Sequence, residues 1–328
     1  MDPETIARPL PQLISVVMPC YNETANVEPL YARLRETFAA IPCQAEFVFV
    51  EHGSIDDTQA KLIALAKQDP RVRIVILSRN FGYQGGIGAG LAHAKGEVVI
   101  VMDGDQQDPP ELIPQMLAEW QKGYDVVYGI RATREASKFH QWGYKQYYRL
   151  LRATAEIKIP LDASDFALMD RRIVDTLNAM PERDRLWRGL RAYAGFSQIG
   201  VPYHRPERGG GASSFTLTSY VRFARRSIFS YSYKPLEWLF IIALLTVALT
   251  IIGGLVYLWL ALTQSDIPRG FPTLILVVLF LGGVQMLGIA IIGEYVGRIF
   301  EEVKQRPLFI VDREVQYRAD LSSEKRLS

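Results

Sequence analysis

Two long uncharged stretches in the C-terminal part constrain this chain most. There are 24 consecutive residues without a charge from Leu239 to Leu262, and 23 more from Phe271 to Gly293. As a helix, the first stretch would be about 36 Å long, and a bilayer's hydrocarbon core is about 30 Å thick. We therefore expect two transmembrane helices, at 236–262 and 271–297, joined by a short turn. Two helices buried in a soluble protein are the alternative.

Basic residues flank the two spans on the same side. They are Arg222, Arg225, Arg226 and Lys234 before the first span, and Arg298, Lys304 and Arg306 after the second. The turn between the spans has Arg269 alone. Because positive residues stay on the cytosolic side, we expect a multi-pass protein of the inner (cytoplasmic) membrane with both termini in the cytosol. No cleavable signal peptide is visible at the N-terminus.

The segment 213–235 mixes aromatic and aliphatic residues with three arginines just ahead of the first span. This composition is typical of an amphipathic helix at the level of the lipid headgroups. An ordinary surface helix is the alternative. We expect a cytosolic domain over 1–212, an interfacial region over 213–235, the spans within 236–297 and a cytosolic C-terminal tail over 298–328.

The N-terminal part alternates short β-rich runs with helical stretches. The expected strands are 13–19, 46–53, 71–78, 97–105 and 124–131, and the expected helices are 26–39, 56–68 and 86–94. Such alternation predicts an α/β fold with a Rossmann-like parallel sheet. Ligands of such sheets bind at the carboxyl ends of the strands.

Charge and cysteine content exclude two classes of protein. The 37 Lys and Arg residues against 35 Asp and Glu give a net charge of only +2, so no nucleic-acid partner is expected. Two cysteines cannot form a disulfide framework, and no metal-binding spacing of cysteines is present.

Polar clusters follow three of the predicted strands. They are Pro19 to Glu23, Glu51 to Thr58, and Asp103 to Pro110. Side by side at one edge of a sheet, these clusters would make a ligand pocket. Capping of the following helices is the alternative for each cluster taken alone.

Asp103 and Asp105 are the sharpest feature. Two carboxylates spaced i, i+2 after a buried strand offer hard oxygen ligands, which suit Mg²⁺ or Mn²⁺ bridging a diphosphate. The glycine run from Gly82 to Gly90 fits neither the G-x-G-x-x-G nor the P-loop spacing. A nicotinamide or P-loop enzyme is therefore disfavoured, and these small residues are expected to let a helix pack closely against the sheet.

The stretches MPCYNE, HGS-x-DDT, SRNFGYQGG and VMDGDQQDPPE resemble glycosyltransferase family 2, whose fold is of the A type. VVYGIR, ASDFALMDR and the R-x-x-R-x-x-G-x-S pattern at 205–213, followed by two apolar spans, resemble its polyprenyl-phosphate branch. That branch includes dolichol-phosphate mannosyltransferases and bactoprenol (undecaprenyl-phosphate) glucosyltransferases. The similarity covers residues 13 to 312.

The resemblance implies roles for individual residues. Nucleotide-sugar binding falls to Pro19, Tyr21, Asn22, Glu23, Val50, His52, Ser54, Gln84, Asp103 and Gly104; the metal to Asp103, Asp105 and Gln107; lipid phosphate to Arg131, Arg205, Arg208 and Ser213; and catalysis to Asp165 and Asp105. Two departures stand out. Position 52 is usually an acid in the family, and this chain has Ser214-Phe215 where relatives often have Lys-Tyr.

With the resemblance, these features predict a metal-dependent transfer of a hexose, glucose from UDP-glucose, to undecaprenyl phosphate at the cytosolic membrane face. The resemblance implies that the transfer inverts the anomeric carbon. A phosphomonoester has a second pKa near about 6 and is largely a dianion at pH 7, so it needs no strong base. We therefore expect Asp165 to orient or stabilise the reacting groups. Asp162 is a competing candidate, and helix capping is the alternative role for Asp165.

Three rival functions remain open from the sequence. The donor could instead be GDP-mannose or a UDP-aminoarabinose derivative. A processive polysaccharide synthase is disfavoured because it would have more spans and a Q-x-x-R-W motif. A catalytically impaired membrane binding module stays open because of His52. Gly253-Gly254 and Gly282-Gly283 leave homo-oligomer formation through the spans open as well.

Overall fold

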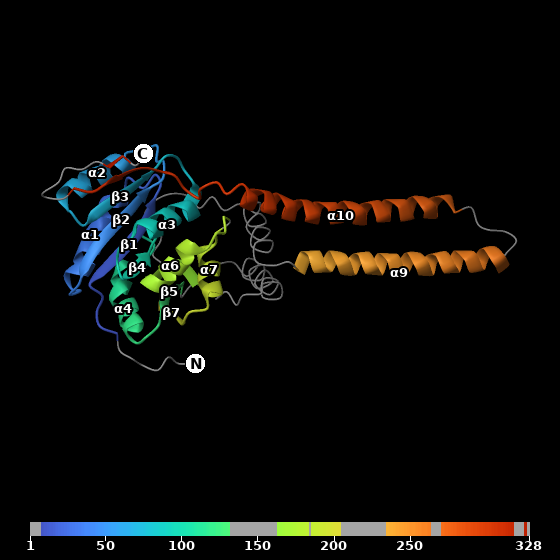
Figure 1. Ribbon diagram of the computed structural model, residues 1–328, viewed down its shortest axis with the longest axis horizontal. Coiled ribbons are helices and arrows are strands. Elements are labelled where there is room, and N and C mark those ends of the chain that lie inside the picture. Colours follow the sequence, from blue (N-terminus) through green and yellow to red (C-terminus); the bar gives the residue numbers. More distant parts are fainter. Residues whose placement is uncertain are drawn as a thin grey trace. The chain divides into compact units, whose positions relative to one another are not determined.

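The computed structural model describes residues 8–131, 163–183, 185–204, 234–263, 270–317 and 325–326 (Figure 1). The chain divides into two compact units. Of the described residues, the first unit contains those up to 204 together with those from 306 onward, and the second contains the two long C-terminal helices.

The first unit is built on one sheet. Its strands are β1 (Leu13–Cys20), β2 (Gln44–Glu51), β3 (Val72–Leu77), β4 (Val98–Val101), β5 (Val126–Arg131), β6 (Ala163–Asp170), β7 (Gln198–Tyr203), β8 (Val311–Val315) and β9 (Lys325–Arg326). They follow the order β7-β5-β6-β4-β1-β2-β3-β8-β9. The strands β1 to β4 are runs of β-branched and aliphatic residues buried on both faces, as expected for a sheet covered by helices on both sides.

Strand direction is mixed. β1 pairs in parallel with β2 and β4, β2 with β3, and β5 with β7. β6 runs antiparallel between β4 and β5, and β8 runs antiparallel to β3. The predicted α/β fold class, a mostly parallel sheet followed by two long apolar helices, is confirmed.

Helices cover both faces of the sheet. They are α1 (Val27–Ala39), α2 (Thr58–Gln68), α3 (Gly82–His93), α4 (Ile113–Gln121) after the 3₁₀ turn η1 (Pro110–Leu112), α6 (Arg171–Ala179) and α7 (Trp187–Ala194). One hydrophobic core lies under α1, α2 and α4, and a second lies under α3, α6 and α7. Alternate residues of β1 supply each core: Val16 and Met18 join the first, and Val17 joins the second.

The glycine run lets α3 approach the sheet closely, as the sequence predicts. A Cβ atom at Gly90 would overlap the Val17 side chain and lie 3.1 Å from Cγ2 of Val50. A Cβ at Gly88 would lie 2.9 Å from Cδ2 of Leu308, in the segment that follows the second long helix. Larger residues at these positions would push α3 away from its neighbours.

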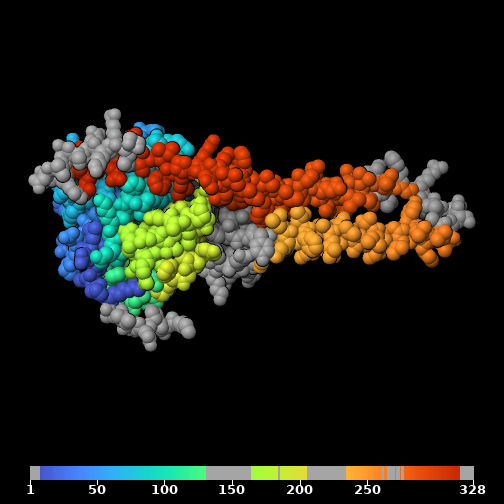
Figure 2. All heavy atoms as spheres, in the orientation of Figure 1, coloured from blue at the N-terminus to red at the C-terminus, as the bar shows by residue number. Residues whose placement is uncertain are grey.

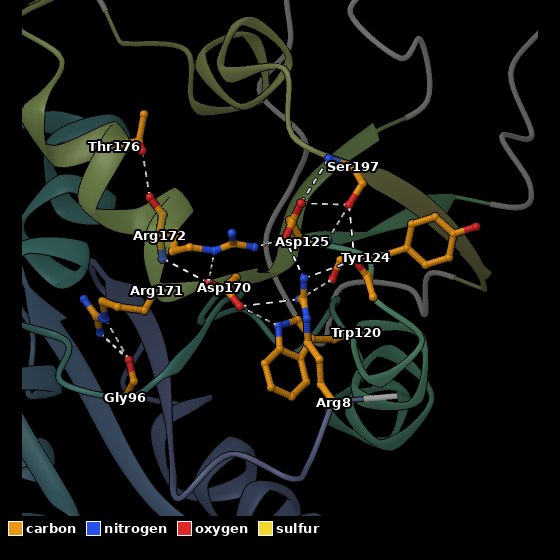
Figure 3. Close-up of polar contacts among 11 residues, drawn as sticks. Arg8, Gly96, Trp120, Tyr124, Asp125, Asp170, Arg171, Arg172, Thr176 and Ser197 are labelled. Atoms are coloured by element: carbon orange, nitrogen blue, oxygen red, sulfur yellow. Dashed lines mark hydrogen bonds and ion pairs between the residues drawn. The ribbon is translucent and has the colours of Figure 1, made fainter. Parts of the chain in front are cut away.

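A polar network ties the N-terminal segment to the edge where β5 begins and β6 ends (Figure 3). Arg8 pairs with Asp125 at 2.8 Å and with Asp170 at 3.4 Å. Asp170 also caps α6 by accepting the backbone N–H of Arg172 at 3.1 Å. Because each carboxylate of this network has a cationic partner, we assign it a structural role.

In the second unit, the described helices are α9 (Lys234–Thr263) and α10 (Phe271–Val303), which lie side by side (Figures 1 and 2). Both are long and apolar enough to cross a membrane, and 0% and 6% of their most apolar windows are buried. This exposure argues against core helices of a soluble protein and supports membrane association. Glu294 pairs with Arg298 at 3.2 Å across one helical turn. The region predicted as interfacial, 213–235, lies outside the described residues except for its last two.

Candidate active site

The ends of three neighbouring strands bring their polar loops to one edge of the sheet. Cys20 at the end of β1 stands opposite Glu51 at the end of β2, and Val17 stands opposite Val101 at the end of β4. The backbone N–H of His52 donates to the carbonyl of Cys20 at 3.3 Å. The loops after β1, β2 and β4 therefore start at the same edge, as the alternation of strands and helices predicts.

Tyr21 and His52 form a stacked pair at this edge. Their ring centroids are 5.4 Å apart and the ring planes differ by 19°. Nδ1 of His52 lies 3.4 Å from Oδ1 of Asn80, which also accepts the backbone N–H of Gly82 at 2.7 Å. Because Asn80 presents an acceptor, the proton belongs on Nδ1, and Nε2 is left as an acceptor in the neutral ring. Burial lowers the pKa of His52, which favours that neutral form.

Asn22 and Ser54 join the loops after β1 and β2. The backbone N–H of Asn22 donates to Oγ of Ser54 at 3.1 Å, and Oδ1 of Asn22 accepts the N–H of Ile55 at 2.9 Å. Asn22 therefore cross-links the loops rather than capping a helix. Asp56 accepts the N–H of Thr58 at 3.0 Å, so the helix-start interpretation holds for that residue.

Asp103 is held both at its side chain and at its backbone. The hydroxyl of Tyr83, in the first turn of α3, donates to Oδ1 of Asp103. The backbone N–H of Asp103 donates to Asp108 at 3.0 Å, and Asp108 accepts the hydroxyl of Tyr203 from β7 at 2.8 Å. Asp108 is fully buried, so it acts as an internal brace of the loop.

Gly104 places the same loop against β1, and Asp105 makes a bond within that loop. A Cβ atom at Gly104 would lie 2.9 Å from the carbonyl oxygen of Pro19 and 3.1 Å from Sγ of Cys20. Oδ1 of Asp105 accepts the backbone N–H of Gln107 at 3.1 Å. Only glycine at position 104 allows the two carboxylates to sit this close to the end of β1.

Negative charge accumulates around Asp103. Burial, then the charge of Asp108, and more weakly those of Asp105 and Asp165, raise the pKa of Asp103 to about 7, while the hydrogen bond from Tyr83 acts in the opposite direction. A divalent cation would relieve this repulsion, so the donor set fits one. In the described part of the chain, no group of three or more His, Cys, Asp and Glu could hold a metal by itself. Mg²⁺ and similar ions often take one or two carboxylates and complete their shell with substrate phosphates.

Asp165 lies in β6, where its charge acts on Asp103 and on Tyr83. Its Oδ1 is 3.8 Å from Nε of Arg188 on α7. The helix-capping alternative for Asp165 is wrong, because α6 starts six residues later and is capped by Asp170. Asp162 lies outside the described residues.

The other predicted residues are placed as follows. Val50 is fully buried and faces α3, and Gln84 accepts two N–H groups of Trp187, at 3.4 Å through its side chain and at 3.1 Å through its carbonyl. Glu23 accepts from the side chain of Asn26 and donates its backbone N–H to Thr58 at 2.8 Å. Arg131 is the last residue of β5. Arg205, Arg208 and Ser213 lie outside the described residues.

Sequence reasoning missed several residues that the fold adds to the site. They are Tyr83, Asn80, Asp108, Tyr203, Arg188 and Arg191. Tyr83 and Asp108 stand inside the motifs SRNFGYQGG and VMDGDQQDPPE, so the sequence does carry a local signal for both. Tyr203 and Arg191 come from β7 and α7, which carry no comparable local pattern.

Comparison with known proteins places the chain. Residues 15–177 match the sequence profile of glycosyl transferase family 2. An uncharacterized glycosyltransferase of Synechocystis sp. is 38% identical over 91% of this chain and 94% of its own length. The bactoprenol glucosyl transferase of Shigella phage SfV is 36% identical over 92% of this chain and 99% of its own. The chain therefore belongs to glycosyltransferase family 2 and is a glycosyltransferase.

A solved structure shows a more distant similarity. It is glucosyl-3-phosphoglycerate synthase from Mycobacterium tuberculosis in complex with Mn²⁺, UDP-glucose and phosphoglyceric acid, which is 17% identical. The alignment covers 66% of this chain and 77% of that chain, with a TM-score of 0.46. Similarity this low does not carry a substrate from one protein to the other.

Proposed function

We propose that this protein transfers glucose from UDP-glucose to undecaprenyl phosphate at the cytosolic face of the inner membrane. The observation that carries the proposal is that one chain combines a carboxylate cluster at the strand ends with two exposed apolar helices. Its similarity to a bactoprenol glucosyl transferase extends over nearly the whole of both chains, so it includes the helices as well as the sheet.

The nucleotide would bind at the ends of β1 and β2. The stacked rings of Tyr21 and His52 offer an aromatic surface for a base, and Nε2 of His52 offers an acceptor for the imide N–H of uracil. The hydrogen bond between Asn22 and Ser54 would hold the two loops together around the ribose. A neutral imidazole can thus replace the carboxylate that the family usually has at position 52.

Asp103 and Asp105, with Gln107, would hold Mg²⁺ or Mn²⁺. When bound, the ion would neutralise the diphosphate and make it a better leaving group. The chain's own part would be to hold the loop with both carboxylates beside the end of β1, for which Gly104, Tyr83 and Asp108 are the candidates.

In the transfer step, an oxygen of the lipid phosphate would attack the anomeric carbon of glucose. The new carbon–oxygen bond forms as the bond from the anomeric carbon to the diphosphate breaks. The electron pair of the broken bond leaves with UDP. Attack opposite the leaving group would invert the configuration at that carbon. Because the phosphate is already a dianion near pH 7, Asp165 would orient the reacting groups rather than remove a proton.

The acceptor phosphate would be held by cationic and hydroxyl side chains. The candidates are Arg131, Arg205, Arg208 and Ser213. Guanidinium groups bind phosphate oxygens in a bidentate manner, which suits a lipid phosphate arriving from the membrane side. We expect both termini in the cytosol, so that the nucleotide sugar and the lipid headgroup are on the same side of the membrane.

Nucleotide-dependent thermal unfolding of the full chain in detergent tests this function. We expect UDP to raise the melting temperature when Mg²⁺ or Mn²⁺ is present, and GDP and ADP to have little effect. EDTA should abolish the shift. A folded protein that responds to no nucleotide would contradict the proposal and favour a membrane binding module. A response to GDP alone would show that the donor is a GDP-sugar and not UDP-glucose.

A further inference from the structure

Helix α7 brings a buried cation to the strand that carries Asp165. The side chain of Arg191 is 3% exposed. Its Nη2 donates to the carbonyl of Ser164 at 2.8 Å, and its guanidinium lies 5.9 Å from the ring centroid of Tyr128. Ser164 immediately precedes Asp165 in β6. Arg191 therefore holds the backbone at the position that fixes where Asp165 points.

The hydrogen bonding of Arg191 is incomplete. Its Nε atom is buried and has no hydrogen-bond partner among the described residues. In the same described part of the chain, no carboxylate lies within 4 Å of the guanidinium. A buried cation in this condition is costly, and an unsatisfied buried group of this kind calls for an explanation.

The opposite charge that acts on Arg191 is that of Asp165. Burial lowers the pKa of Arg191 to about 10, and the charges of Asp165 and, more weakly, Tyr128 and Tyr83 act in the opposite direction. Arg188, one turn earlier on α7, lies 3.8 Å from Asp165 and opposes Arg191 as a like charge. The two arginines thus supply positive charge near the carboxylate of Asp165. Another charged group that interacts with Asp165 is the carboxylate of Asp103.

We propose that Arg191 is a positioning residue for the transfer reaction, which acts by holding Asp165 toward Tyr83 and Asp103. This inference rests on the proposed function. Without the hydrogen bond from Arg191 to the carbonyl of Ser164, the backbone that carries Asp165 would be held less firmly. A group misplaced by about 1 Å loses much of its effect on the rate, while binding of the nucleotide at β1 and β2 is left unchanged.

The alternative is that Arg191 only attaches α7 to β6. The two roles differ in how they depend on Asp165. A positioning role disappears when Asp165 has no charge to position, whereas an attachment of two elements matters equally with or without it. A double-mutant cycle separates these cases.

The test measures glucose transfer and UDP affinity of the full chain in detergent. We expect Arg191→Met to lower kcat by about 10- to 100-fold while the Kd for UDP stays within about 2-fold. Arg191→Lys keeps the charge but not the planar set of guanidinium N–H donors, and it should lower kcat by about 3- to 10-fold. In an Asp165→Asn background, either substitution should lower kcat further by less than about 3-fold.

Arg71→Met is the matched control. Arg71 pairs with Asp69 just before the start of β3, at the opposite end of the strands from the candidate site, so this substitution should leave kcat unchanged. Equal losses in both backgrounds would overturn the role of Arg191 while leaving the transfer reaction in place. If Arg191→Met fails to fold, the cycle is run with Arg191→Lys. A wild-type chain that transfers no sugar would overturn both this inference and the proposed function.

Discussion

The hydroxyl of Tyr203 donates a 2.8 Å hydrogen bond to Asp108, which lies 95 residues earlier in the chain. The other oxygen of Asp108 accepts the backbone N–H of Asp103. The ring of Tyr203 stands edge-on to Phe166 and lies over Gly129, where any Cβ atom would meet it at 2.6 Å. Strand β7 thus supports the carboxylate loop after β4.

Removing this one hydroxyl tests the brace. Tyr203→Phe takes one donor from a buried carboxylate, which should destabilise the protein by about 1–3 kcal/mol. We also expect metal-dependent UDP binding to weaken, because the backbone of Asp103 is held less firmly. Calorimetric titration with UDP and Mn²⁺ measures the effect. Tyr193→Phe is the control, since Tyr193 is 63% exposed, and an equal change in both variants would refute the bracing role.

The two acidic residues after β4 should be required for metal-dependent nucleotide binding. Asp103→Asn and Asp105→Asn each remove a hard oxygen ligand, and we expect the Mn²⁺-dependent part of UDP affinity to fall at least about 10- to 100-fold. Asp175→Asn serves as the control because the side chain of Asp175 on α6 is 64% exposed. Unchanged Mn²⁺ dependence in both variants would exclude these residues as the metal site.

Asp165 should be helpful but dispensable. Because the proposed acceptor is a phosphate, which needs no deprotonation, Asp165→Asn should leave measurable turnover and should not alter UDP affinity. Initial rates of transfer and a UDP titration measure the two quantities. Complete loss of transfer with intact UDP binding would show instead that Asp165 is an obligatory base.

The segment after α10 should stabilise the first unit. Leu308 and Phe309 are partly buried against the core under α3, and β8 pairs with β3 just beyond them. Leu308→Ala should cost about 1–3 kcal/mol, which lowers the melting temperature by several degrees. Ile310→Ala is the matched control, since Ile310 is 49% exposed, and it should have little effect. Equal melting temperatures for the two variants would contradict this packing.

Sequence patterns predict the parts of this fold that are locally encoded. β1 to β5 are apolar runs bounded by polar turns, and α9 and α10 are uniformly apolar over their central turns. Periodicity and length are therefore enough to predict these elements. The clusters after β1, β2 and β4 follow from parallel pairing alone. Helix α3 begins at Gly82, four residues before the predicted start, because glycines are poor helix formers and hide the first turn.

Long-range pairing accounts for what the patterns miss. β6 contains Asp165 and leads directly into α6, so its residues look like the start of a helix, and only its neighbours β4 and β5 make it a strand. β8 has three charged residues, and nothing local indicates that it pairs with β3. The same holds for Asp108 and Tyr203 and for Asp165 and Arg191, whose partners come from separate elements.

The most direct test of the account is transfer of labelled sugar to undecaprenyl phosphate by the full chain in detergent, from a panel of nucleotide sugars. Each donor is assayed with Mg²⁺, with Mn²⁺ and with EDTA. We predict one labelled lipid, formed from UDP-glucose in the presence of either metal ion and absent with EDTA. No transfer from any donor by a folded protein would contradict the account, and equal transfer in EDTA would contradict the role of Asp103 and Asp105.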